Sequence, residues 1–143
     1  MNPQNHSVAP EDFRRLFESS PAQYVVVNRE FRIVAATDSV LEAGGRRRED
    51  IVGLLITDAY PDNPDNPDAN GTEVLRSALQ RVLDERTGHV LPIQRYDIEV
   101  DGIFEERYFK PLNEPVLSAD GEVEYIIHGV ENVTESVKAT QAS

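Results

Sequence analysis

Two runs of β-branched and aromatic residues near the start of the chain, residues 24–27 and 31–36, lie on either side of a polar turn. This pattern predicts an antiparallel β-hairpin with residues 28–30 as its turn. Before the hairpin, a proline and two acids at residues 10–12 favour the start of a helix. Pro21 ends that helix, because the residue before a proline avoids helical angles.

The middle of the chain passes from short helical segments through a proline-rich loop to one long helix. Residues 61–68 alternate proline with Asp and Asn, which predicts a surface loop. An apolar stripe with helical spacing predicts a helix over residues 72–87, ended by Gly88. Asp38 is expected to cap the first of the short helices. These short helices are predicted at 38–43, 48–52 and 54–60.

Three longer strands are predicted at the end of the chain, over residues 90–100, 104–116 and 123–133. Asp-Gly pairs at 101–102 and 120–121 are typical of the hairpin turns between them. The apolar positions change parity inside the first of these strands, which predicts a bulge near Gln94. Pro111 and Pro115 confine the far end of the second strand to an edge or a bulge.

The order of these elements predicts an α+β domain. Five strands form one antiparallel sheet, the short helices and the long helix pack on one face, and the N-terminal helix flanks them. A chain of 143 residues is long enough for one such domain with one core. We expect a flexible tail over residues 1–9, the domain over 10–134 and the start of an output helix over 135–143.

Composition removes several classes of function. The net charge of −12 argues against a nucleic-acid partner, which requires a basic face. The chain has no cysteine, which excludes disulfides, thiol nucleophiles and flavin chemistry through a cysteine adduct. No apolar run approaches the ~20 residues that span a bilayer. We therefore expect a cytoplasmic protein with no membrane partner.

Three motifs follow one another in a fairly specific order and spacing. They are Leu16-Phe17-Glu18-Ser19-Ser20-Pro21 leading into the first hairpin, Arg95-Tyr96-Asp97-Ile98 with residues 104–108, and Val130-Glu131-Asn132-Val133-Thr134-Glu135. On these residues the chain resembles a PAS domain, a sensor module of bacterial signalling proteins such as sensor histidine kinases. The resemblance covers about residues 11–137.

The resemblance implies three functional features. It implies a pocket between the sheet and the helices, and a homodimer held by the N-terminal helix through Phe13, Leu16 and Phe17. It also implies an output helix after the last strand, with Asn132, Val133 and Thr134 transmitting the signal. The chain departs from the family pattern at Thr37, where asparagine is common, and at Asn132, where aspartate is usual. The neutral Asn132 is expected to weaken the charged contact between the last strand and the output helix.

Haem, calcium and cysteine-adduct flavin are all disfavoured as cofactors. Haem-binding relatives carry an axial histidine on the long helix, but residues 72–87 contain none and His89 follows the helix end. The loop beginning at Asn66 superficially resembles a calcium loop. Its first position lacks aspartate, and its twelfth is Ser77 where glutamate is required. The three histidines have no metal-binding spacing.

A small organic ligand is the remaining candidate for chemistry. Arg107 could clamp a carboxylate or phosphate bidentately, or else form a cross-strand ion pair with Asp97. His128 lies in an apolar strand, where a histidine is more commonly a hydrogen-bonded residue of the sheet. The candidate ligand-binding residues are Gln94, Tyr96, Arg107, Tyr108 and His128.

The function predicted is a sensor that detects a small molecule or intracellular signal. Rearrangement of the dimer and linker helix passes that signal to a downstream effector such as a histidine kinase. The alternative is a constitutive dimerisation or docking module whose pocket is filled by Tyr60, Tyr96 or Phe109. A small α+β cyclase or isomerase is a third possibility, but it needs a buried acid–base pair that the sequence does not provide. The helix from Thr134 is too short to be stable alone, so we expect an effector after it.

Overall fold

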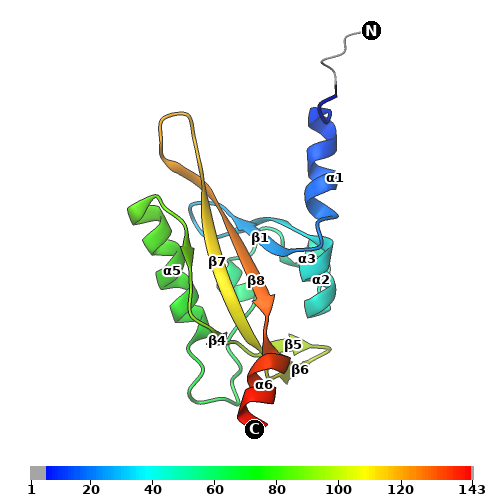
Figure 1. The fold of residues 1–143 in the computed structure, drawn as a ribbon, viewed down its shortest axis with the longest axis vertical. Coiled ribbons are helices and arrows are strands. Elements are labelled where there is room, and N and C mark those ends of the chain that lie inside the picture. The colour runs from blue at the N-terminus through cyan, green and yellow to red at the C-terminus, as the bar shows by residue number, and fades with distance from the viewer. Residues whose placement is uncertain (1–5, 143) are drawn as a thin grey trace.

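The protein is built around one antiparallel sheet with helices packed against it (Figure 1). The computed structural model describes residues 6–142. The strands lie in the order β2–β1–β8–β7–β3, and β4 also pairs with β7. Because β3 and β4 share one side of β7, the sheet is five positions wide, as predicted. The strands are β1 Gln23–Val27, β2 Ile33–Ala36, β3 His89–Val90, β4 Gln94–Arg95, β7 Tyr108–Leu117 and β8 Val123–Asn132.

The helices fall into three groups. Helices α2 to α5 pack against the sheet, α1 stands away from it, and α6 follows β8 at the far end of the molecule (Figure 1). Of the predicted tail, residues 1–5 lie outside the described residues, as does Ser143. The helices are η1 Pro10–Asp12, α1 Phe13–Glu18, α2 Asp38–Gly44, α3 Arg48–Ile51, α4 Ile56–Ala59, α5 Gly71–Glu85 and α6 Thr134–Ala142.

The core lies between one face of the sheet and helices α2 to α5. From the sheet, Val27 and Ile126 are completely buried, and from α5 Leu79 and Val82 meet them. Each such side chain contributes ~1.5–3 kcal/mol relative to an exposed one. The apolar stripe predicted for the long helix is therefore confirmed as its core-facing side, with Val74 at the exposed margin.

The end of α5 and the cap of α2 differ from the predicted ones. Helix α5 ends at Glu85, and Arg86 then adopts a left-handed conformation with φ 56°. Gly88 does not end the helix. A Cβ atom there would lie 2.3 Å from Oε1 of Glu114, so the glycine permits close packing against β7. At α2 the cap is Thr37, whose side chain accepts a hydrogen bond from the N–H of Val40; the prediction of Asp38 was wrong by one residue.

The strand predicted over residues 90–100 is divided into three. Leu91 to Ile93 separate β3 from β4, which places the expected irregularity just before Gln94. After β4 the chain leaves the sheet and forms a two-stranded ribbon from β5 (Ile98–Val100) and β6 (Ile103–Glu105). The prolines of β7 fit this arrangement, because Pro111 faces the break and Pro115 lies beyond the last residue paired with β3.

Candidate functional site

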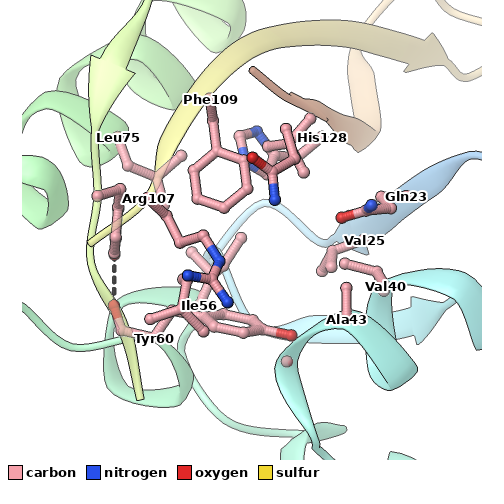
Figure 2. Close-up of a pocket in the computed structure, with 15 residues that line it drawn as sticks. Gln23, Val25, Val40, Ala43, Ile56, Tyr60, Leu75, Arg107, Phe109 and His128 are labelled. Carbon is pink, nitrogen blue, oxygen red and sulfur yellow. Dashed lines mark hydrogen bonds between the residues drawn. The ribbon is translucent and has the colours of Figure 1, made fainter. Parts of the chain in front are cut away.

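A cavity of about 80 Å³ lies between the sheet and helices α2, α4 and α5 (Figure 2). Most of its wall is apolar. The apolar part consists of Val25, Val40, Ala43, Gly44, Ile56, Leu75, Ile98, Phe109 and Val130. The polar part consists of Gln23, Tyr60, Tyr96, Arg107, His128 and Asn132. This is the pocket position expected between sheet and helices.

Three of the five predicted ligand-binding residues meet at this cavity: Tyr96, Arg107 and His128. Gln94 lines a neighbouring cavity instead, and its Nε2 donates to Oδ1 of Asn70 at 3.2 Å. Tyr108 precedes Phe109 on β7, so the alternation of side chains along a strand places it on the opposite face. Its hydroxyl donates to Oε2 of Glu106 at 2.9 Å.

Two tyrosines form one side of the cavity. The hydroxyl of Tyr96 donates to the backbone carbonyl of Tyr60, the bond drawn dashed in Figure 2. The hydroxyl oxygen of Tyr60 is buried and has no hydrogen-bond partner within the described residues. Burial raises the pKa of both phenols, so both stay protonated at neutral pH. Arg46 lies outside this wall, with its Cζ 5.4 Å from the centroid of the Tyr60 ring.

Arg107, the residue before β7, projects into the cavity above Tyr60 (Figure 2). Its Nη2 donates to the carboxylate of Glu105, and its Nη1 donates to the backbone carbonyl of Glu106 at 3.3 Å. The alternative pairing with Asp97 was wrong. Asp97 is buried and pairs with Arg95 on the same segment, Nε to Oδ1 at 3.0 Å.

The buried carboxylate of Asp97 is satisfied without the guanidinium of Arg107, although the backbone N–H of Arg107 donates to it. Its second oxygen accepts a 3.0 Å hydrogen bond from Nδ2 of Asn63, which ties the proline-rich loop to the ribbon. Burial alone would raise the pKa of Asp97, but the bonds from Arg95 and Asn63 outweigh it and the pKa is lowered. The guanidinium of Arg107 therefore remains in the cavity wall.

His128 pairs with Asn113 across β8 and β7, with Nδ1 2.7 Å from Oδ1 of the amide. Burial lowers the pKa of His128 to about 4, so the imidazole is neutral at neutral pH. Because an amide oxygen only accepts, Nδ1 carries the proton and Nε2 is left as an acceptor. The histidine is thus a hydrogen-bonded sheet residue that also lines the cavity.

The three residues expected to transmit a signal lie together where β8 passes into α6. Oδ1 of Asn132 accepts hydrogen bonds from the N–H of Thr134 at 3.0 Å and from its hydroxyl at 2.6 Å. The N–H of Val133 donates to the carbonyl of Tyr108 at 2.9 Å. Asn132 therefore keeps the acceptor geometry of a carboxylate without its charge. Asn132 also lines the cavity.

A second cavity of about 190 Å³ lies between α5 and the strands β4, β7 and β8, with Leu91 and Pro92 at its edge. Its wall includes Tyr96, Phe109 and His128, which line the first cavity as well. These shared side chains separate the two spaces.

Tyr60 and Gln23 were not predicted as ligand-binding residues. Tyr60 and Phe109 were expected only as pocket-filling side chains, which their places in the wall also permit. For Gln23 a signal was present, because it is two residues before the buried Val25 and so lies on the same face of β1. Strand periodicity extended by one residue would have identified it.

Within residues 6–142, no group of three or more His, Asp or Glu side chains is placed to hold a metal ion. The described helices include none that is long and apolar enough to cross a membrane. Among the described residues that line the 80 Å³ cavity, Arg107 carries the only full charge at neutral pH. The site thus offers one cation and several neutral polar groups in an apolar wall.

Solved structures with the same fold include two PAS domains and a sensor histidine kinase. The PAS domain of a protein from Colwellia psychrerythraea has a TM-score of 0.66 at 10% identity, covering 87% of this chain and 97% of that one. The PAS domain of BvgS from Bordetella pertussis has a TM-score of 0.62 at 22% identity, covering 92% and 91%. A sensory box sensor histidine kinase from Vibrio cholerae has a TM-score of 0.58 at 17% identity, covering 84% and 87%.

The sequence agrees with this structural likeness. No curated protein shows significant sequence similarity to the chain. The family model of the PAS fold, however, matches residues 17–138, which include the whole sheet, helices α2 to α5 and the junction with α6. The chain therefore belongs to the PAS family.

Proposed function

We propose that this PAS domain is a sensor whose cavity binds a small molecule and whose C-terminal helix responds to occupancy. The observation that carries the proposal is the double placement of Asn132, which lines the cavity and holds the first turn of α6 through Thr134. A ligand that contacts the amide of Asn132 changes the partners of that side chain. It thereby favours one arrangement of α6 over another.

The change in α6 is proposed to reach an effector domain after it. Helix α6 has no buried residue, so little packing against the domain opposes a change in its position. The likeness to a sensory box sensor histidine kinase from Vibrio cholerae supports a histidine kinase as that effector. A kinase of this class requires intracellular ATP, so we propose a cytoplasmic location for the domain.

A homodimer is proposed to carry the rearrangement between subunits. Helix α1 stands away from the sheet (Figure 1), and its apolar face is incompletely covered. Phe13 is 59% exposed and Leu16 is 53% exposed, while Phe17 is half-buried. Apolar side chains of this size are usually covered, and a second copy of α1 across a twofold axis would cover them.

A constitutive dimerisation or docking module is the second candidate. Tyr60, Tyr96 and Phe109 all lie in the cavity wall and leave about 80 Å³ free. Drug-sized ligands occupy pockets of ~300 Å³ or more, so these side chains fill much of the space such a ligand requires. The third candidate, a small enzyme, lacks support because the described cavity wall contains no carboxylate to pair with His128 as acid and base.

The two leading candidates are separated by the mass of the purified domain. Native mass spectrometry followed by denaturing mass spectrometry detects a bound molecule as an extra mass that disappears on denaturation. That result supports the sensor, and the value of the mass restricts the identity of the ligand. A dimer without extra mass, purified from several growth conditions, supports the docking module.

A further inference from the structure

We propose that the ligand of this cavity is a short-chain monocarboxylate, with its carboxylate held by the guanidinium of Arg107 and the hydroxyl of Tyr60. The inference rests on the proposed sensor function, since it names the chemical class that the sensor detects. Arg107 supplies the charge, Tyr60 supplies an unused hydrogen-bonding group, and the apolar wall accommodates an aliphatic tail.

The charge of the cavity wall selects an anion. The chain has 26 acidic residues and a net charge of −12, yet the described wall contains one cation and no carboxylate. Glu105 pairs with Arg107 from the rim, where the Glu105 side chain is 44% exposed. An exposed partner of this kind contributes little. A guanidinium has five N–H donors, and Glu105 and the carbonyl of Glu106 each accept one, so donors remain for a ligand.

The hydroxyl of Tyr60 indicates where the anion binds. A buried hydroxyl without a partner is rare in folded proteins, and that of Tyr60 has none within the described residues. Figure 2 shows the Arg107 guanidinium above the Tyr60 ring, with the hydroxyl pointing along the cavity toward Ala43. A carboxylate between the two accepts from both. Burial raises the pKa of Tyr60, which keeps its proton available for this bond.

The size and apolarity of the cavity restrict the rest of the molecule. The free space of about 80 Å³ is small beside the ~300 Å³ or more of pockets that hold drug-sized ligands, so the ligand must be small. Val25, Val40 and Ile56 line the space and suit a short aliphatic chain. Inorganic phosphate has no apolar part and would leave these side chains without a partner. An acid of two to four carbons satisfies both the cation and the apolar wall.

Titration calorimetry with a matched series of compounds tests the ligand class. Acetate, propionate and butyrate are compared with butyramide, which has the shape of butyrate without its charge, and with inorganic phosphate. We expect butyrate to bind at least tenfold more tightly than butyramide and phosphate. Each added methylene is expected to improve affinity about fourfold until the cavity is full. Equal binding of butyramide, or no binding of any acid at millimolar concentration, would overturn the proposal.

Two variants assign the carboxylate to its partners. Tyr60→Phe is expected to weaken butyrate binding about tenfold. The free domain should keep or gain thermal stability, because the unpartnered hydroxyl is removed; a purely structural role for this hydroxyl predicts the reverse.

Arg107→Met is expected to weaken butyrate binding tenfold to a hundredfold, and Arg107→Lys is expected to recover part of that affinity. Arg81→Met is the matched control, because it removes an equal charge from an exposed ion pair on α5.

Amide exchange of α6 separates this inference from the sensor proposal. If butyrate binds as expected but exchange over residues 134–142 is unchanged, the ligand class stands and the sensor proposal fails. If no acid binds but a molecule of another class copurifies and alters exchange in α6, the ligand class is wrong and the sensor proposal stands.

Discussion

The backbone N–H of Tyr108, the first residue of β7, donates a 2.9 Å hydrogen bond to Oγ1 of Thr134, the first residue of α6. The same hydroxyl donates to Oδ1 of Asn132 at 2.6 Å. Arg107, which lines the cavity, is joined to Tyr108 by a peptide bond. The cavity wall and the first turn of the C-terminal helix are thus connected through adjacent residues on both strands of the central hairpin.

Replacing Thr134 by valine tests this connection. Thr134→Val keeps the shape of the side chain but leaves the N–H of Tyr108 without its acceptor and removes one of the two hydrogen bonds to Oδ1 of Asn132. We expect α6 to detach while the sheet remains intact, with a loss of about 1–2 kcal/mol in local stability. Hydrogen exchange measures this loss of local stability directly, as faster exchange at the N–H of Tyr108 and across residues 134–142.

Thr134→Ser provides the matched control for this experiment. Serine retains the hydroxyl, so exchange in α6 is expected to stay close to that of the original domain. If the valine variant also exchanges at the original rate, the hydroxyl does not hold the helix. The junction would then depend on two bonds from backbone N–H groups, that of Val133 to the carbonyl of Tyr108 and that of residue 134 to Oδ1 of Asn132.

Most of the fold could be predicted from local signals because those signals coincide with the tertiary structure. The apolar stripe of α5 and the Asp-Gly turn before β8 each determine one element independently of the rest. The strand over residues 90–100 was different. Pro92 interrupts it, and the chain then departs from the sheet into a separate ribbon. Whether a strand continues past such a break depends on its partner, which no local pattern specifies.

The candidate site was predictable only in part for the same reason. Tyr96, Arg107 and His128 do meet at the cavity, whereas Gln94 and Tyr108 lie elsewhere. The face that a side chain occupies depends on strand register, and a shift of one residue reverses it. The alternative ion pair between Arg107 and Asp97 does not form, because the carboxylate of Asp97 pairs with Arg95 instead.

Thr37 is predicted to be a main determinant of stability at the start of the domain. Its side chain is completely buried, accepts a 3.1 Å hydrogen bond from the N–H of Tyr24 and donates at 2.8 Å to the carbonyl of Ala22. It also caps α2. Thr37→Val should therefore cost about 2–3 kcal/mol of unfolding free energy. Chemical denaturation measures this, and Thr37→Ser, which keeps the hydroxyl, is expected to cost distinctly less.

His128 is predicted to make the domain less stable in mild acid. Burial lowers its pKa to about 4 in the folded protein, whereas an unfolded histidine titrates near 6.5. The unfolded chain therefore binds more protons between these values. Stability is full above about pH 6.5 and falls as the pH drops towards 4, by roughly 3 kcal/mol. The free energy of unfolding, measured by denaturation at several pH values in this range, should fall less steeply with decreasing pH for His128→Gln than for the original domain. An equally steep fall in both proteins would mean that another group causes the loss.

Helix α1 is predicted to hold the homodimer through its two exposed apolar residues. Phe13→Glu combined with Leu16→Glu should give a folded monomer, because both side chains lie outside the domain's own core. Phe17 is half-buried and is left unchanged to protect folding. Sedimentation measures the mass, and circular dichroism confirms the fold. Arg14→Ala is the control, since this side chain is 81% exposed on the same helix and should not affect association. A variant that remains dimeric would place the interface on another surface.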